Sequence, residues 1–357
     1  MLNSQIPYNQ LPLLSELPFK PTDKLVATSR QCQMSLSYLK GYLDALPQND
    51  LFFISRWFQL LELKYSFDLE NNSISIQRLF ESSVSKQKNN DKTTQLILGQ
   101  FVAENKIIGK DLSDFNRFYI SKVGKKKSEF SLFRDKSKAV VKSYFTNLVL
   151  YTAPDQANVL SRLKKDLNKA LLTKPFEDDL INLCLIHLQI RAVAPFTQFN
   201  DASARFNSQF IIQTLLERFI PIPFSQQLMS VKEDYNVILK NALFNEAYES
   251  WCLLLINAIQ ESIEKMIMKL KQIFQLKEKQ SLILLKFTNY KLPDELIMVL
   301  MKHPFVKTSD IMLLLNCHRQ TAYTYLKQMV KAGLLISKKT GREQVYYNKE
   351  LMDVLIY

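Results

Sequence analysis

The residues of this chain that could handle a phosphate group gather in one segment, residues 194–205, which reads Ala-Pro-Phe-Thr-Gln-Phe-Asn-Asp-Ala-Ser-Ala-Arg. The segment lies between two predicted helices, and the start of a helix is a natural anion site because its first N–H groups have no partner within the helix. A backbone that wraps closely around phosphate also needs glycine, which has no Cβ. The chain has only 6 glycines, and none lies between Gly124 and Gly333. A Walker A loop and a G-x-G-x-x-G turn are therefore excluded from the middle of the chain.

The segment resembles the signature of the Fic (Fido) family of adenylyltransferases, H-P-F-x-(D/E)-G-N-G-R-x-x-R. The positions that match are Pro195, Phe196, Asn200 and Arg205. A second stretch, Ser66-Phe67-Asp68-Leu69-Glu70-Asn71, is similar to the family's autoinhibitory pattern (S/T)-x-x-x-E-(G/N) and precedes the core, as in one subclass. That subclass commonly opens with a proline-rich arm and ends with a winged helix after a long helix. The resemblance therefore spans nearly the whole chain.

The resemblance implies that most of the family's catalytic positions are lost. Ala194 stands where the family has the histidine that takes the proton from a target hydroxyl, and a methyl group cannot accept a proton. Gln198 stands at the acidic Mg²⁺ ligand, and its neutral side chain is a poor ligand for a hard dication. Phe199 and Asp201 replace the glycines beside the phosphates, and Ala202 replaces the first arginine. Together these losses leave little catalysis to expect.

Charged residues of the motifs keep roles that need no catalysis. Asp201 is a good N-cap for a helix that starts at Ala202, so we expect its carboxylate to fill the anion site from within. The resemblance pairs the inhibitory Glu70 with Arg205, which would clamp the N-terminal helices to the core. The alternative is that residues 66–71 match the pattern by chance and that both charges are ordinary helix-surface residues.

Histidine and cysteine usage predicts neither a metal site nor disulfides. The 3 histidines are far apart in the sequence, and no C-x-x-C pair links the 4 cysteines, which is typical of reduced thiols in a cytoplasm. His187 lies on the predicted helix that leads to Ala194; we interpret it as a buried core histidine, with a replacement base as the alternative. No apolar run is long enough for a membrane span. We therefore expect a cytoplasmic protein with no membrane partner.

The low glycine content and the helical spacing of apolar residues predict a mainly α-helical fold. Residues 130–154 are the exception, because their branched and aromatic residues predict a small hairpin, a flap near Phe145 to Tyr151. The spacing over Asp234 to Lys277 predicts one long helix or two helices end to end. We divide the chain into an N-terminal arm and helical region with the inhibitory motif (residues 1–92), a Fic-like core with a long connecting helix (93–290) and a winged helix-turn-helix domain (291–357).

The predicted C-terminal domain has the order helix, helix, helix, two-stranded wing, which is the winged helix-turn-helix plan. The whole chain has a formal net charge of +13, and the part from Lys302 onward has nine Lys or Arg against four Asp or Glu. In this plan the second helix of the turn faces the bases and the wing meets backbone phosphates. The candidate DNA contacts are Arg319, Gln320, Thr321, Tyr323, Thr324 and Lys327 on that helix, and Lys338, Lys339 and Arg342 on the wing. The alternative is a protein-interaction module whose same positions are only solvated.

These observations favour a pseudoenzyme, a degenerate Fic-like protein that acts as a scaffold or regulator with a DNA-binding winged helix and needs no cofactor. The first alternative is an enzyme with residual or altered transfer of AMP from ATP to protein hydroxyls (AMPylation), which would use ATP and Mg²⁺ and have a protein target. A further alternative is ATP binding without chemistry. The partners we expect are DNA, a partner or target protein, and a second copy of the chain in a homodimer.

Overall fold

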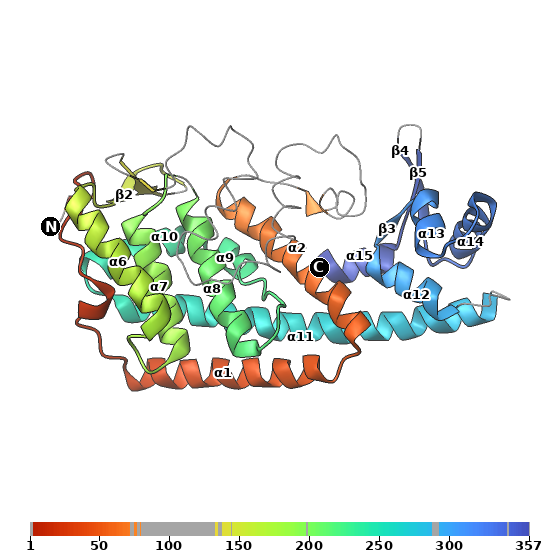
Figure 1. Ribbon diagram of the computed structural model, residues 1–357, viewed down its shortest axis with the longest axis horizontal. Helices are drawn as coiled ribbons and strands as arrows, with labels where there is room; N and C mark the ends of the chain where they lie inside the picture. The colour runs from red at the N-terminus through yellow and green to blue at the C-terminus, as the bar shows by residue number, and fades with distance from the viewer. Residues whose placement is uncertain are drawn as a thin grey trace.

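The computed structural model describes residues 3–71, 75–76, 79, 133–134, 138–143, 145–197, 199–287, 293–340 and 343–356. These residues are mainly helical, as predicted, with small antiparallel sheets. The molecule is elongated, and helix α11 (Tyr248–Phe287) runs along most of its length (Figure 1). A helical body surrounds the first part of α11, and the C-terminal elements lie near its other end (Figure 1).

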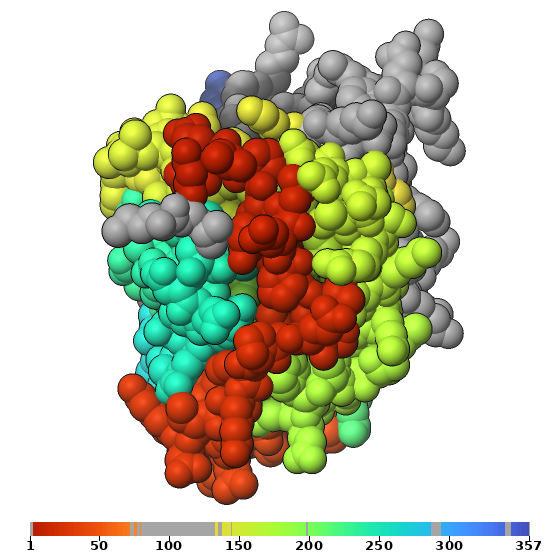
Figure 2. All heavy atoms as spheres, turned by 90° about the vertical axis from the view of Figure 1, so that its left-hand side faces the viewer, coloured from red at the N-terminus to blue at the C-terminus, as the bar shows by residue number. Residues whose placement is uncertain are grey.

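The N-terminal arm, residues 3–22, lies over the helical body, as its spaced prolines predict. Leu11 and Leu14 of the arm are buried, and the Tyr8 N–H donates to the Thr152 carbonyl at 3.0 Å. Figure 2 shows this arm, in red, running down the end of the body. After the short 3-10 turn η1 (Leu14–Glu16) come α1 (Asp23–Asp44), which packs along α11, and α2 (Gln48–Leu69).

The body continues with helices that carry the motif segment. They are α6 (Ala157–Thr173), α7 (Asp179–Val193), α8 (Asn200–Leu216), α9 (Ser225–Ser230) and α10 (Lys232–Phe244). Helix α7 is buried on nearly all sides because α6, α8 and α11 surround it. Its sequence is accordingly apolar all round, as expected for a core helix.

The prediction for residues 234–277 was only partly right. The stretch forms α10 and α11, but these helices do not run end to end; they are joined by a turn at residues 245–247 and pack against each other. Glu246 in this turn has a φ of +54°, a conformation that ends a helix. Helix α11 then continues past Lys277 to Phe287.

The predicted hairpin is present beside the body. Strands β1 (Val140–Lys142) and β2 (Val149–Thr152) pair antiparallel, with Val141 opposite Tyr151. The Tyr151 hydroxyl donates to the Ala192 carbonyl at 2.9 Å, which ties the hairpin to the end of α7. The hairpin thus lies against the motif segment.

The C-terminal elements are compatible with the predicted winged helix. In order they are α12 (Pro293–Lys302), β3 (Phe305–Val306), α13 (Thr308–Leu314), α14 (Arg319–Lys331), β4 (Ile336–Thr340), β5 (Glu343–Tyr347) and α15 (Lys349–Ile356). The sheet order is β3-β5-β4, and both pairings are antiparallel. Gly333, with a φ of +76°, follows α14 as expected for a helix end. The sequence did not predict β3 or α15.

The predicted domain boundaries at residues 92/93 and 290/291 both lie outside the described residues. None of the helices that the structure describes is both long enough and apolar enough to cross a bilayer.

Candidate functional site

The motif segment forms a tight turn between α7 and α8. Ala194, at the end of α7, and Phe199, just before α8, both have left-handed backbones, with φ of +43° and +61°. The Asn200 side chain fixes the turn, because its Oδ1 accepts from the Phe196 N–H and its Nδ2 donates to the Phe196 carbonyl, both at 2.9 Å. Asn200 therefore holds the shape of the loop.

A cavity of about 530 Å³ lies over this turn. The end of α2, the hairpin, the α7–α8 junction and α10 enclose it. The candidate site residues in its lining are Glu70, Asn71, Ala194, Phe199, Asn200 and Asp201. The structure thus brings the inhibitory motif and the signature motif to one cavity, although they are far apart in the sequence.

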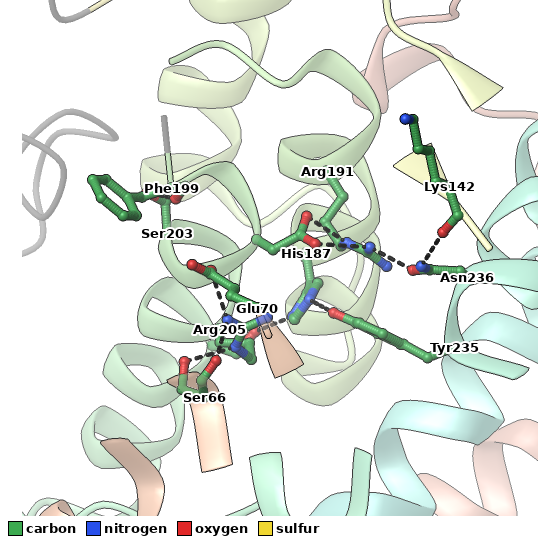
Figure 3. Close-up of polar contacts among 12 residues, drawn as sticks. Ser66, Glu70, Lys142, His187, Arg191, Phe199, Ser203, Arg205, Tyr235 and Asn236 are labelled. Carbon is green, nitrogen blue, oxygen red and sulfur yellow. Dashed lines mark hydrogen bonds and ion pairs between the residues drawn. The ribbon is translucent and has the colours of Figure 1, made fainter. Parts of the chain in front are cut away.

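The predicted pair between Glu70 and Arg205 is present. Arg205 Nη2 lies 2.9 Å from Glu70 Oε1, and the guanidinium also donates to the Ser66 hydroxyl at 2.9 Å and the Ser66 carbonyl at 3.0 Å. The Arg205 side chain is only 2% exposed. The Ala202 backbone also hydrogen-bonds to the Glu70 carboxylate. Glu70 therefore takes the anion position at the start of α8 and joins α2 to the core (Figure 3).

The predicted cap by Asp201 is wrong. Helix α8 begins at Asn200, so Asp201 lies inside its first turn, and the N-cap residue Phe199 makes no side-chain cap. The Asp201 carboxylate instead pairs with Arg191 of α7, with Nε–Oδ1 of 2.9 Å and Nη2–Oδ2 of 3.1 Å. The physical reason is that the Arg191 side chain is 0% exposed and a buried guanidinium needs a counter-charge. Burial alone would raise the pKa of Asp201, but Arg191 holds it below its usual range.

His187 does not face the cavity as a base. It is fully buried; its Nδ1 lies 2.8 Å from the Ser208 hydroxyl and its Nε2 lies 2.6 Å from the Tyr235 hydroxyl (Figure 3). Burial, together with the nearby Arg191 and Arg205, holds the His187 pKa well below 6.5. The interpretation of His187 as a satisfied core histidine agrees with these contacts.

The chain is similar to known proteins both in sequence and in fold. Residues 289–351 match the family model of the C-terminal domain of SoFic-like protein adenylyltransferases. The fold resembles that of a Fic family protein from Desulfovibrio desulfuricans G20, with a TM-score of 0.61 and 15% identity over 93% of this chain and 98% of that chain. The chain therefore has the fold of Fic family proteins. A Fic domain containing signaling protein from Bacteroides thetaiotaomicron VPI-5482 is similar at a TM-score of 0.50 and 15% identity, over 66% of this chain and 95% of that one.

Sequence reasoning missed Arg134. Its guanidinium is buried and donates to the Ala194 and Val193 carbonyls, at 2.8 and 2.9 Å, and to Pro154 at 2.7 Å. A positive charge at these carbonyls satisfies the C-terminal end of α7 and holds the motif turn. The sequence shows Arg134 only as one member of the basic stretch from Lys122 to Lys142, and nothing in the neighbouring sequence marks it as buried.

The candidate DNA-contact residues that the structure describes lie on α14 and β4. Their exposed members are Arg319, Gln320, Tyr323, Thr324, Lys327, Lys338 and Lys339, whereas Thr321 is half-buried. Gln198 and Arg342 lie outside the described residues. Among the residues that the structure describes, no group of three or more His, Cys, Asp or Glu side chains could hold a metal ion.

Proposed function

We propose that this Fic-like protein does not transfer AMP, and that its helical body is a scaffold or regulator for a DNA-binding C-terminal domain. The observation that carries the first half is Ala194. It lines the cavity at the position that corresponds to the motif histidine, and its methyl group cannot take a proton from an attacking hydroxyl. His187 does not replace it, because Ser208 and Tyr235 occupy both ring nitrogens.

The residues around the cavity do not fit the phosphates of ATP. The Asp201 carboxylate lies beside the start of α8, where a phosphate would need positive charge. Glu70 already binds the Ala202 N–H and Arg205, the groups that would otherwise attract an anion. Phe199 adds a ring where close approach of the backbone requires glycine. We therefore propose a function that uses no cofactor.

A transfer assay tests this half of the proposal. The wild-type chain and Ala194→His are incubated with labelled ATP and Mg²⁺, with the heat-denatured chain as the control. We expect no label above the control for the wild type or Ala194→His, because the base and the phosphate-binding backbone are both missing. Mg²⁺-dependent labelling of protein hydroxyls by the wild type would instead establish the alternative, residual AMP transfer. Stabilisation of the wild type by ATP in a thermal shift, without labelling, would establish nucleotide binding without chemistry.

The charge distribution on the C-terminal elements supports DNA as a partner. Helix α14 and strand β4 contain no acidic residue, while they present Arg319, Lys327, Lys338 and Lys339 to solvent. Three acids of this region are engaged elsewhere: Asp310 accepts from the Lys307 N–H, Glu350 pairs with Lys279, and Asp353 pairs with Lys349. A one-signed surface on a helix and an adjoining strand is the pattern of a nucleic-acid contact.

Binding to duplex DNA at several salt concentrations tests the second half. We expect the affinity for duplex DNA to fall steeply as the salt concentration rises. Arg319→Ala should lose about 1–3 kcal/mol of binding free energy if this arginine reads a base edge. Lys349→Ala is the charge-matched control, because Lys349 pairs with Asp353 on α15. Binding that is indifferent to Arg319→Ala and Arg342→Ala would contradict the DNA assignment and favour a protein-interaction module. A protein partner, a homodimer and a cytoplasmic location remain part of the proposal.

A further inference from the structure

A groove of about 860 Å³ runs beside the exposed face of α14. It lies between the starts of α13 and α14 and strand β5, and its lining includes Lys307, Ser309, Arg319, Tyr323 and Gln344. None of the lining residues that the structure describes is acidic. The nearby Asp310 turns its carboxylate to the Lys307 backbone, with Oδ2 at 2.7 Å from the N–H. The groove is therefore lined by hydrogen-bond donors and positive charge, which select an anionic occupant.

The register of the sheet separates the neighbouring wing lysines. Lys339 lies opposite Gln344, and Lys338 lies opposite Val345. Residues directly opposite each other on paired strands share a face, and successive residues point to opposite faces. Gln344 and Tyr346 line the groove, so Lys339 belongs to the groove face of the sheet. Lys338 belongs to the other face.

The Tyr323 side chain in the groove does not offer a stacking platform for a base. The Lys327 ammonium lies over the Tyr323 ring, 4.7 Å from its centroid. A nucleobase that stacked on this face would have to displace a favourable cation–π contact. The groove thus fits a chain of phosphates better than an unstacked base.

We propose that the groove holds the sugar–phosphate backbone of one strand of duplex DNA, with Lys307 and Lys339 as phosphate contacts. This inference rests on the proposed DNA-binding function and adds residues to it. Lys307 precedes α13 and belongs to neither the recognition helix nor the wing. In this arrangement Lys307 and Lys339 hold the protein in place on the duplex, and the first turn of α14 reads the bases.

The test measures how the affinity of the full chain for duplex DNA of mixed sequence depends on salt concentration. The variants are Lys307→Ala and Lys339→Ala, with Lys349→Ala as the control, because Lys349 pairs with Asp353 on α15. Each lost phosphate contact lowers the slope of log K against log salt by about 1, so the first two variants should each lose about one unit. Lys349→Ala should keep the wild-type slope.

Different outcomes separate this inference from the function on which it rests. If the wild type does not bind duplex DNA, the proposed function itself fails. If the wild type binds but Lys307→Ala keeps its slope, only the groove assignment is overturned. A loss in Lys349→Ala equal to that in Lys339→Ala would overturn it as well, because the slope would then not report contacts made in the groove.

Discussion

Arg191 and Asp201 form a two-point ion pair that joins the end of α7 to the start of α8, with Nε–Oδ1 of 2.9 Å and Nη2–Oδ2 of 3.1 Å. Arg191 Nη2 also donates to Asn236 Oδ1 at 2.8 Å. The guanidinium carbon of Arg191 lies over the Tyr235 ring, 4.1 Å from its centroid. The carboxylate that the sequence placed as a helix cap is thus the counter-charge of a buried arginine. The junction that corresponds to a phosphate site in the Fic motif is held here by the protein's own charges.

This ion pair predicts that Asp201→Asn destabilises the fold. The substitution leaves the Arg191 charge buried without its counter-charge, which costs about 3 kcal/mol in the free energy of unfolding. Urea unfolding measures it. The control is Asp44→Asn, whose carboxylate pairs with Lys40 and Arg218 at the surface, and we expect a much smaller change there because solvent screens these pairs. Equal losses in the two variants would contradict a special role for the buried pair.

The left-handed backbone of Phe199 gives a second prediction. Phe199→Ala and Phe199→Gly remove the same ring, but only glycine adopts a φ near +61° without strain. We therefore expect Phe199→Gly to be more stable than Phe199→Ala by about 1 kcal/mol in urea unfolding. At Phe206, inside α8, the order should reverse, because glycine weakens a helix interior. If Phe199→Ala is instead more stable than Phe199→Gly, the backbone of Phe199 is not strained.

Sequence reasoning succeeded where a local pattern carries the information. Apolar spacing predicted a mainly α-helical fold with one small hairpin, and the motif pattern predicted the pair between Glu70 and Arg205 across two elements. It failed where the partner of a charge is set by packing. Aspartate is a good N-cap, so Asp201 was assigned to the nearest helix start, while its actual partner projects from the buried end of α7. Arg134 was missed for the same reason, since its burial depends on the hairpin and α7 meeting in space.

The buried His187 predicts how stability depends on pH. In the unfolded chain a histidine binds a proton below about pH 6.5, but burial prevents this in the folded protein, where the His187 pKa lies well below that value. Its contribution to stability is therefore complete above pH 6.5 and is lost as the pH falls, by at most about 1.4 kcal/mol per pH unit. His303, whose pKa burial lowers to about 4, adds a loss of the same sign.

The measurement is urea unfolding between pH 5 and 7. His187→Gln should be less stable at pH 7 but should show a slope with pH that is shallower than the wild type by up to about 1.4 kcal/mol per unit. His318→Gln, at an exposed position, is the control and should keep the wild-type slope. Asp201 acts in another window: its pKa lies below 3.8, so its contribution is present above that value and is lost only as the pH falls through its folded pKa. A His187→Gln slope equal to that of the wild type would mean that the buried histidine titrates normally.

The contact between α11 and the C-terminal elements supplies the last prediction. Gln280 Nε2 donates to Asn348 Oδ1 at 3.1 Å, and Asn348 Nδ2 donates back to Gln280 Oε1 at 2.9 Å. Both side chains are buried, and Asn348 also accepts from the Leu351 N–H at the start of α15. Because Gln280→Leu leaves the Asn348 amide buried with fewer partners, it should cost about 1–3 kcal/mol and loosen the attachment of α15 to α11.

Hydrogen exchange of the α15 amides measures this loosening. Gln260→Leu is the matched control on the same helix, because its amide contacts Glu264 at the surface. We expect faster exchange of α15 in Gln280→Leu and no change in Gln260→Leu, since only the first removes a contact between the two parts. Unchanged exchange in Gln280→Leu would mean that apolar packing and the Lys269 bonds to the Val354 and Leu355 carbonyls suffice to hold α15 on α11.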